Sequence, residues 1–221
     1  TGSMAAARGG FTSVFCMPNT KPVIDSKDSY DALVDIIKND ACINVFPVGA
    51  ITKGQMGKEL SEIEKMAESG VKAVSEDGKS VMNSLLCREG MKLAKALNIP
   101  VFAHCEDIDL VCGGVMNEGK RAQMLGLKGI TNAVEDIIAA RDIFLAKETG
   151  VRLHLCHVST RDSVKMIQLA KEDGVNVTGE VCPHHFTLCD EDIPSDDSNY
   201  KMNPPLRSRA DMEALIEGIR T

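Results

Sequence analysis

The feature that most constrains the fold is a regular alternation of two hydrophobic periods along the chain. Short runs rich in β-branched residues, typical of buried strands, alternate with longer stretches whose apolar residues recur at helical spacing. The strand-like runs span residues 10–16, 42–48, 71–75, 100–104, 151–157 and 175–181. The helix-like stretches span residues 26–39, 58–69, 84–97, 131–149, 160–173 and 209–219. This alternation predicts an α/β protein with a parallel sheet.

Glycines mark the ends of several predicted helices. Gly70, Gly150 and Gly174 each follow a helix-like stretch and precede a strand-like run, and Asn98 holds the same place before residue 100. Glycine and asparagine favour the left-handed backbone conformation that often ends a helix. We therefore expect helix C-caps at these four positions.

Two segments, residues 106–130 and 183–208, interrupt the alternation. Both follow the carboxyl end of a predicted strand. In α/β proteins, long loops at these strand ends commonly carry function. We expect these two loops to border the functional site.

An alternation of this kind can build either a doubly wound open sheet or a (β/α)₈ barrel. No Gly-x-Gly-x-x-Gly or other phosphate-binding loop follows the first strand-like run, so the barrel is favoured. A complete barrel has eight strands and about 250 residues, whereas this chain of 221 residues provides six predicted strands. We predict one domain over residues 1–221, with an α/β fold that is an incomplete (β/α)₈ TIM barrel.

Composition narrows the class of protein. A formal net charge of −7 argues against a basic surface for nucleic acid or anionic lipid. No apolar run reaches the ~20 residues of a membrane span, and the first residues lack the apolar stretch of a signal peptide. The eight cysteines form no Cys-x-x-Cys pair, which is typical of reduced cysteines in the cytoplasm. We expect a cytoplasmic protein that binds neither nucleic acid nor membrane, with a core built from aliphatic side chains because aromatic content is only 4%.

Three predicted strands end in residues that can bind a metal. Because side chains alternate between the faces of a strand, the rows that end in Asp77, His104 and His157 can all face the barrel axis. The three side chains would then meet at the carboxyl-terminal mouth of the barrel. Two imidazoles and one carboxylate form a catalytic zinc ligand set that leaves a position for water. The pattern predicts a metal-dependent hydrolase.

The remaining histidines are assigned differently. On the same alternation His154 falls on the opposite strand face, where a hydrogen-bonded core histidine is the more common outcome, so we do not count it as a ligand. His184 and His185 follow Pro183 close to the predicted mouth. They could orient the metal ligands or serve a structural role, and the sequence leaves both alternatives open.

Seven motifs in a fixed order connect the chain to a known family. They are Gly9-Gly10-Phe11-Thr12 with Met17-Pro18-Asn19-Thr20, Ser75-Glu76-Asp77-Gly78, Ala103-His104-Cys105-Glu106, Gly113-Gly114-Val115-Met116-Asn117-Glu118-Gly119, Cys156-His157-Val158-Ser159-Thr160, Pro183-His184-His185, and Tyr200-Lys201-Met202-Asn203-Pro204-Pro205-Leu206-Arg207. Through them the chain resembles the dihydroorotases of the amidohydrolase superfamily, specifically the type I enzymes of pyrimidine biosynthesis. The likeness covers essentially all 221 residues.

The resemblance implies a zinc-dependent cyclic amide hydrolase that interconverts dihydroorotate and N-carbamoyl-L-aspartate, with one or two Zn²⁺ ions. Asp77 matches the carboxylate that bridges the metals, and His104 and His157 match the two strand-end histidines that hold the more buried metal. Asn19 matches the residue that helps to hold the substrate carboxylate, and Asn203 matches the residue that lines the pyrimidine ring through its main chain. The partners it implies are the small-molecule substrate, a second copy in a homodimer, and aspartate carbamoyltransferase.

The chain departs from the family at both ends. Family members begin the barrel with a His-x-His strand followed by Arg, which supplies two more metal ligands and a carboxylate clamp, and no His-x-His occurs in this sequence. The eighth-strand Asp, a metal ligand and proton shuttle in the family, is expected beyond Arg220. The six predicted strands therefore correspond to strands 2 to 7. No catalytic base is assigned, and we expect the chain by itself to be inactive and to hold metal partially or not at all.

Three other functions are considered. Allantoinases and hydantoinases share the barrel and the cyclic-amide chemistry, but their bridging ligand is typically a carbamylated Lys where Asp77 stands. A non-catalytic, dihydroorotase-like scaffold subunit for aspartate carbamoyltransferase is a second alternative, although Asp77, His104 and His157 argue against it. A metal-free binding domain is the third.

Overall fold

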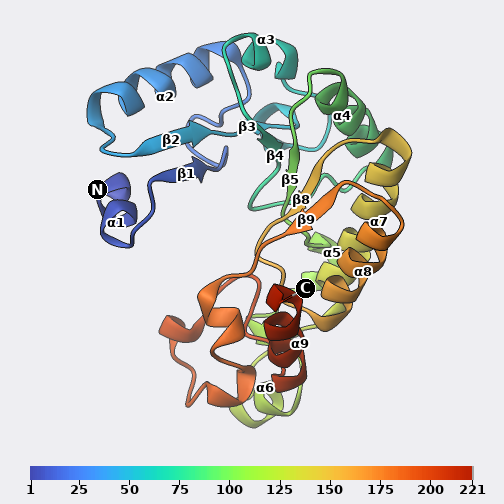
Figure 1. Ribbon diagram of the computed structural model, residues 1–221. Helices are drawn as coiled ribbons and strands as arrows, with labels where there is room; N and C mark the ends of the chain where they lie inside the picture. Colours follow the sequence, from blue (N-terminus) through green and yellow to red (C-terminus); the bar gives the residue numbers. More distant parts are fainter. Residues whose placement is uncertain (221) are drawn as a thin grey trace. The chain divides into compact units, whose positions relative to one another are not determined.

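The computed structural model describes residues 1–220, which group into two compact units. Unit 1 consists of residues 1–102 and 149–152, and unit 2 consists of residues 103–148 and the chain from residue 153 onward. Figure 1 labels the helices and strands of both units. The single domain expected over residues 1–221 stays a prediction.

Unit 1 alternates strands and helices. In chain order its elements are α1 (Gly2–Arg8), β1 (Ser13–Cys16), α2 (Lys27–Asp40), β2 (Asn44–Pro47), β3 (Gly49–Ala50), η1 (Lys53–Gln55), α3 (Ile63–Glu68), β4 (Val74–Ser75), α4 (Ser84–Ala96) and the first two residues of β5 (Val101–Ala103). β1 pairs in parallel with β2, and β4 pairs in parallel with both β3 and β5. Helix α2 runs alongside β1 and β2 (Figure 1). The α/β alternation expected from the sequence is therefore present in this unit.

The strand expected over residues 42–48 is shorter in the structure, where it is β2, and a further strand, β3, follows it with a different neighbour. The Val48 N–H donates to the Cys16 carbonyl at 3.0 Å, whereas the next N–H, that of Gly49, donates to the Ala73 carbonyl at 3.1 Å. A side chain at Gly49 would meet Met66, because a Cβ built there lies 2.8 Å from the Met66 Cε. Glycine thus lets β3 approach α3 closely.

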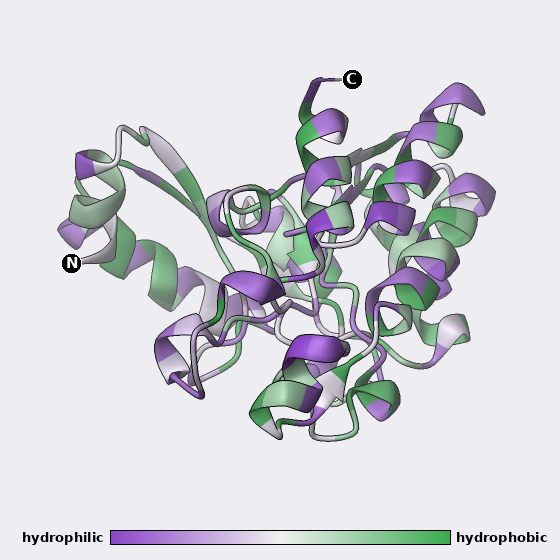
Figure 2. Cartoon of the chain, turned by 90° about the horizontal axis from the view of Figure 1, so that it is seen from below, coloured by the Kyte–Doolittle hydropathy of each residue, from purple (hydrophilic) through white to green (hydrophobic). Residues whose placement is uncertain are grey.

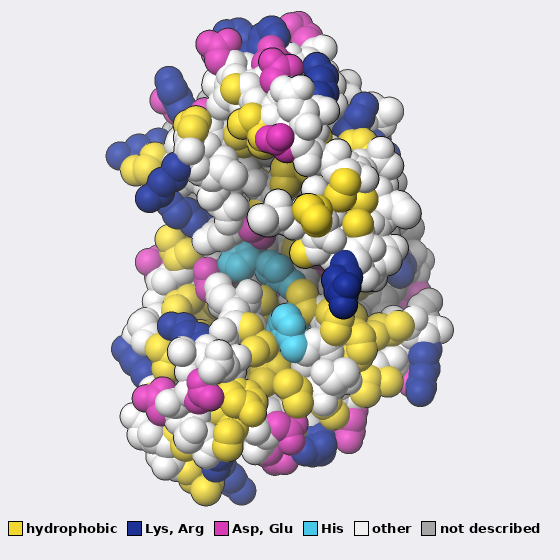
Figure 3. Space-filling view, turned by 90° about the vertical axis from the view of Figure 1, so that its left-hand side faces the viewer, with side chains coloured by type: hydrophobic (Ala, Val, Ile, Leu, Met, Phe, Trp, Pro, Cys, Tyr) yellow, Lys and Arg dark blue, Asp and Glu magenta, His cyan; other side chains and the backbone are white. Residues whose placement is uncertain are grey.

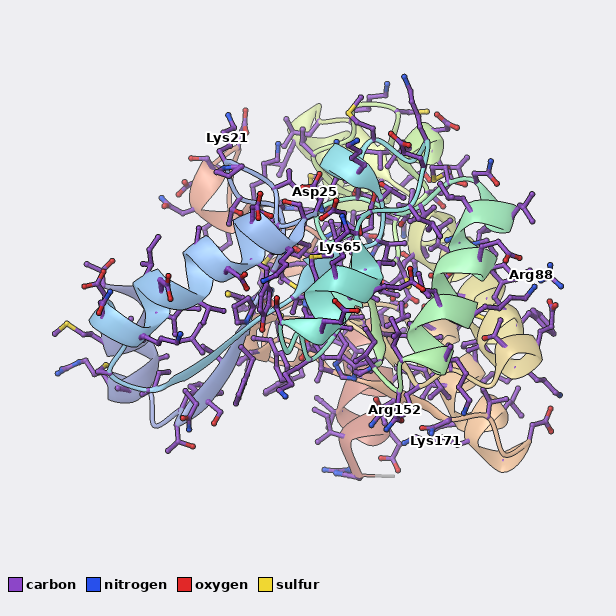
Figure 4. The ribbon with its side chains drawn as sticks, turned by 90° about the horizontal axis from the view of Figure 1, so that it is seen from above. Lys21, Asp25, Lys65, Arg88, Arg152 and Lys171 are labelled. Atoms are coloured by element: carbon purple, nitrogen blue, oxygen red, sulfur yellow. The ribbon has the colours of Figure 1, made fainter. Side chains whose placement is uncertain are left out.

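The helix expected over residues 58–69 is shorter in the structure. Residues 59 and 61 form backbone hydrogen bonds with Lys53 and Ile51 at 3.0 Å, so the chain before α3 is extended rather than helical. The turn containing Gly54 is held by Asp25 (labelled in Figure 4), whose Oδ2 accepts the Gly54 N–H at 2.7 Å. Helical periodicity in the sequence did not anticipate these longer-range hydrogen bonds.

Unit 2 contains the remaining elements. They are α5 (Ile108–Val111), β6 (Met116–Asn117), α6 (Lys120–Leu125), β7 (Gly129–Ile130), α7 (Ala133–Thr149), β8 (Leu153–Leu155), α8 (Arg161–Glu172), β9 (Val177–Gly179), η2 (Pro183–Phe186), η3 (Asp190–Asp192), η4 (Ser198–Tyr200) and α9 (Arg209–Arg220). β8 pairs in parallel with β9, and β6 pairs in parallel with β7. Helix α8 packs against both β9 and α9 (Figure 1).

The two segments expected as loops contain short elements. Residues 106–130 form α5, α6 and the β6–β7 pair, and residues 183–208 contain η2, η3 and η4. The two segments share a hydrophobic cluster whose buried members are Met116, Ala122, Ile193 and Leu206. They are therefore ordered by a small core of their own, which their sparse apolar residues did not predict.

Several helix boundaries follow the sequence directly. The Asn83 side chain accepts the Leu85 N–H at 3.0 Å at the start of α4, and Thr160 accepts the Ser163 N–H at 3.2 Å at the start of α8. The left-handed backbone predicted at four helix ends is confirmed, because Gly70, Asn98, Gly150 and Gly174 all have positive φ. The C-caps themselves are the residues just before three of them, Ser69, Leu97 and Asp173. The φ of Asn98 is 55°.

The buried core is largely aliphatic, as the composition predicts. In unit 1 it includes Ile63, Met66 and Met91, and in unit 2 it includes Leu153 and Leu155, all fully buried. Several helices, among them α2, α4, α8 and α9, carry hydrophobic and hydrophilic residues on different sides (Figure 2). None of the eight cysteines, all within residues 1–220, forms a disulfide bond. Among residues 1–220 no helix is long and apolar enough to cross a membrane.

Candidate metal-binding site

Two of the predicted ligands, His104 and His157, lie together in unit 2. His104 directly follows β5, and His157 lies two residues beyond β8. The His104 Nδ1 and the His157 Nε2 are 2.9 Å apart, with the rings nearly perpendicular at 79°. Tetrahedral zinc separates two imidazole nitrogens by roughly 3.3 Å. The spacing suits a shared metal ion, and the metal-binding role of both residues stays a prediction.

The backbone at His157 is unusual. Its φ is +37°, although histidine carries a Cβ. The backbone on either side is fixed, because the Cys156 N–H donates to the Ala103 carbonyl at 3.0 Å and the Val158 N–H donates to the Glu180 carbonyl at 2.8 Å. A left-handed non-glycine residue costs about 1–3 kcal/mol and persists where its surroundings hold it. The strand end therefore imposes this conformation on His157.

A buried carboxylate secures the turn after His157. Glu135 on α7 is 3% exposed and accepts the backbone N–H groups of both Ser159 and Thr160. It also accepts the hydroxyl of Ser159, whose Oγ in turn accepts Arg207 Nε at 3.1 Å. The sequence carries no signal for the role of Glu135, because nothing in its helix distinguishes it from a surface acid.

Glu106 connects a predicted metal ligand to a predicted substrate residue. Its Oε2 lies 3.2 Å from His104 Nε2, and its Oε1 accepts the Asn203 side-chain N–H at 2.9 Å. The hydrogen bond with His104 holds the pKa of Glu106 below its usual range, so the group stays a carboxylate. The signal for Glu106 was available in the sequence, because it lies two residues after His104 and strand alternation repeats every two residues.

The other two predicted site residues touch each other in unit 1. Asn19 Nδ2 donates to Asp77 Oδ2 at 3.3 Å, and the Asp77 backbone N–H donates to Ser75 Oγ at 3.0 Å. The next residue, Gly78, has φ +83°, and a Cβ there would lie 3.0 Å from Asn19 Nδ2. Asn19 and Asp77 therefore form one small cluster. The three-residue ligand set of Asp77, His104 and His157 stays a prediction.

Glu76, the neighbour of Asp77, accepts hydrogen bonds from backbone N–H groups instead. It is 4% exposed and accepts the N–H groups of Ile51 and Thr52 at 3.2 and 3.0 Å, together with the Thr52 hydroxyl. Burial raises its pKa. Glu76 and Asp77 thus have different roles. Strand alternation predicts this difference, because successive side chains point to opposite faces.

The remaining histidines have partners of their own. His154 Nδ1 lies 2.8 Å from Thr178 Oγ1, and its Nε2 lies 3.5 Å from Glu180 Oε2. The rings of His184 and His185 are 4.3 Å apart between centroids. Figure 3 shows histidine side chains gathered on one face. Every histidine belongs to unit 2, so the grouping is a property of that unit.

A model of the dihydro-orotase-like family matches residues 1–163 of the chain. The chain belongs to this family. It is 50% identical over 220 residues to the dihydroorotase of Acetivibrio thermocellus, covering 100% of this chain and 52% of that protein. It is 52% identical over 224 residues to the dihydroorotase of Pelotomaculum thermopropionicum, covering 99% of this chain and 51% of that protein. The chain spans about half the length of the curated relatives it matches.

Solved structures agree on the fold. A D-hydantoinase from Thermus sp. superposes with a TM-score of 0.77 at 23% identity, covering 99% of this chain and 50% of that one. The Saccharomyces cerevisiae dihydroorotase, solved in complex with 5-fluoroorotic acid, superposes with a TM-score of 0.75 at 16% identity, covering 97% of this chain and 60% of that one. The dihydro-orotase-like chain has the α/β fold of an incomplete (β/α)₈ barrel, as the sequence predicted.

Proposed function

We propose that this chain supplies the histidine ligands and part of the substrate pocket of a zinc-dependent dihydroorotase, which interconverts dihydroorotate and N-carbamoyl-L-aspartate in pyrimidine biosynthesis. The observation that carries the proposal is the 2.9 Å approach of His104 Nδ1 and His157 Nε2 in a chain 50% identical to a dihydroorotase. In this proposal Asp77, His104 and His157 hold the metal, and Asn19 and Asn203 contact the substrate.

The donor set at His104 fits a metal ion. Its Nε2 faces the Glu106 carboxylate at 3.2 Å and its Nδ1 faces His157. A proton on Nε2 would bond to Glu106 and leave the Nδ1 lone pair for the metal, the carboxylate–histidine–zinc arrangement of many metalloenzymes. His104 is 6% exposed, which keeps competing water away from the ring.

Bound zinc would supply Lewis acidity toward a ring amide and make hydroxide available near neutral pH. The residues of this chain have supporting roles. Glu106 fixes both His104 and the Asn203 side chain, so one carboxylate positions a metal ligand and a substrate contact together. Ring opening adds one water across an amide C–N bond, and the ring nitrogen leaves with a proton.

A chimera tests the proposal. Residues 1–220 would replace the matching half of the Acetivibrio thermocellus dihydroorotase, whose identity extends over 220 residues. We expect the chimera to open dihydroorotate, and to prefer it over hydantoin and allantoin. His104→Ala should reduce kcat/KM at least a thousandfold and lower the zinc content. His154→Ala is the matched control and should keep both, while a zinc-loaded chimera that leaves dihydroorotate intact would contradict the proposal.

A reducing, cytoplasmic location is also proposed. None of the eight cysteines forms a disulfide bond, and several are buried where oxidation would disturb packing. The homodimer and the aspartate carbamoyltransferase partner are proposals too, and both can be tested by measuring the mass of the chimera in solution, alone and with that partner.

A further inference from the structure

A second group of metal-binding side chains lies just after β9, in unit 2. Cys182, His184 and His185 each offer one ligand atom, and these atoms all lie within 4.8 Å of one another. His184 and His185 belong to the short η2 helix, and Cys182 immediately precedes it. The proposed dihydroorotase site uses none of these residues.

His185 carries a buried atom without a partner. The residue is 2% exposed, and its Nε2 lies 2.9 Å from the Pro204 carbonyl oxygen. Because a carbonyl only accepts hydrogen bonds, the proton must be on Nε2, which leaves a bare lone pair on Nδ1. Among the residues that the structure describes, Nδ1 has no hydrogen-bond partner. A buried polar atom left without a partner destabilises the fold, so its presence requires an explanation.

The tautomer of His185 is the one that metal-bound histidines adopt. Such histidines typically donate their other ring N–H to a carboxylate or to a backbone carbonyl, which fixes the ring. Burial lowers the pKa of His185 to about 4 and also lowers the pKa of His184. Both rings are therefore neutral at physiological pH, as metal ligands must be.

Cys182 completes the donor set. The side chain is half-buried, and burial raises the pKa of its thiol. In the absence of a metal it remains a thiol, and coordination would release its proton. One thiolate with two imidazoles suits Zn²⁺, whose tetrahedral geometry places such ligands roughly 3.3–3.6 Å apart.

We propose that Cys182, His184 and His185 form a second binding site for Zn²⁺, distinct from the site at His104 and His157. The site offers three protein ligands and leaves a fourth position for water or another ligand. The lone pair of His185 Nδ1, unpartnered in the free protein, is the feature that zinc would satisfy.

Cobalt(II) titration of the 221-residue chain tests the site, because a cobalt–thiolate bond absorbs in the near ultraviolet and a cobalt–imidazole bond does not. We expect this charge-transfer band in the unmodified chain. It should be absent in Cys182→Ser and retained in Cys112→Ser, the matched control at an exposed cysteine. Circular dichroism confirms that each variant is folded.

A third variant separates this site from a neighbouring group. His154, Cys156 and Glu180 also have ligand atoms within 4.8 Å of one another. Cys156→Ser should therefore keep the band if the proposal is correct. A band that survives in Cys182→Ser and disappears in Cys156→Ser would overturn it.

Thiol protection provides a second measurement that needs no substitution in the buried ring. We expect Zn²⁺ to slow the alkylation of Cys182 by iodoacetamide at least tenfold, as measured by peptide mass spectrometry. Cys112 should react at an unchanged rate. His184→Ala, at a half-buried position, should abolish the protection of Cys182. Equal alkylation rates with and without Zn²⁺ in the unmodified chain would refute the site.

Discussion

Glu135 accepts the backbone N–H of Ser159 with both carboxylate oxygens, at 3.0 and 3.2 Å, in a region closed to solvent. Ser159 lies two residues after His157, so the acid on α7 fixes the turn that follows a predicted metal ligand. Arg207 extends the same network through the Ser159 hydroxyl and the Ile130 carbonyl. The network therefore holds the turn that follows His157.

Removal of the Glu135 carboxylate should destabilise the protein strongly. Glu135→Ala leaves the N–H groups of Ser159 and Thr160 buried without acceptors, and each such group costs about 1–3 kcal/mol. We expect the free energy of unfolding, measured in urea, to fall by roughly 3 kcal/mol. Glu135→Gln keeps one acceptor oxygen and should lose less. Glu172→Ala, at an exposed acid on α8, is the control. An equal loss in the free energy of unfolding for this variant would show that the hydrogen bonds of Glu135 do not stabilise the protein.

Substrate binding should depend on Asn203. Its side chain is held by Glu106 at 2.9 Å, beside His104. In the chimera, Asn203→Ala should raise KM about tenfold, which corresponds to ~1.4 kcal/mol of binding, with little change in kcat. Asn199→Ala is the matched control, because Asn199 bonds to Asp197 on an exposed turn. An unchanged KM with a collapsed kcat would assign Asn203 to the chemical step instead.

The 221-residue chain by itself should not open dihydroorotate, even with added zinc. Its sequence contains no His-x-His and therefore lacks the ligands that this family places on its first strand. Ring opening can be followed by the loss of dihydroorotate in a chromatographic assay, with the chimera as the positive control. Turnover by the chain near the rate of the chimera would mean that other residues replace the missing ligands.

Stability should depend on pH through Asp190. Burial raises the pKa of this carboxyl, which is 7% exposed and accepts Asn117 Nδ2 at 2.6 Å. Because the folded state holds the proton more tightly than the unfolded state, the group stabilises the fold more as pH falls through the raised pKa toward 3.8. Asp190→Asn keeps an acceptor for Asn117 and removes the charge.

Relative to Asp190→Asn, the unmodified chain should therefore gain stability between pH 7 and pH 4. Urea unfolding of both proteins across this range measures the difference. Nearby Glu191 and Asp211 also carry negative charge, so both proteins must be compared at each pH. A difference that stays constant with pH would mean that Asp190 titrates normally.

The parts of the fold that depend on local chemistry could be predicted from the sequence. Asn98 and Gly174 were placed at helix ends because few residue types adopt positive φ, and the structure confirms both. The parts that depend on distant partners could not be predicted. The neighbour exchange between Val48 and Gly49 is decided by the carbonyls of Cys16 and Ala73, which no local pattern specifies.

In the candidate site, too, features set by local pattern could be predicted and features set by distant partners could not. Strand alternation selected His104 and His157, whose ring nitrogens lie 2.9 Å apart. Glu135 was missed, because its role depends on a turn 24 residues further along the chain. Hydrogen bonds between buried groups at such separations depend on tertiary packing, and periodicity carries no information about them.

The left-handed backbone at His157 restricts which metal-binding residue types can replace histidine at this position. Among non-glycine residues, asparagine, aspartate and histidine are several-fold enriched at positive φ. Other residue types reach it at a cost of about 1–3 kcal/mol, and this chain holds Cys112 there at φ +51°. At position 157 an oxygen ligand from aspartate therefore suits the backbone better than a sulfur ligand from cysteine, which would add this strain to the site.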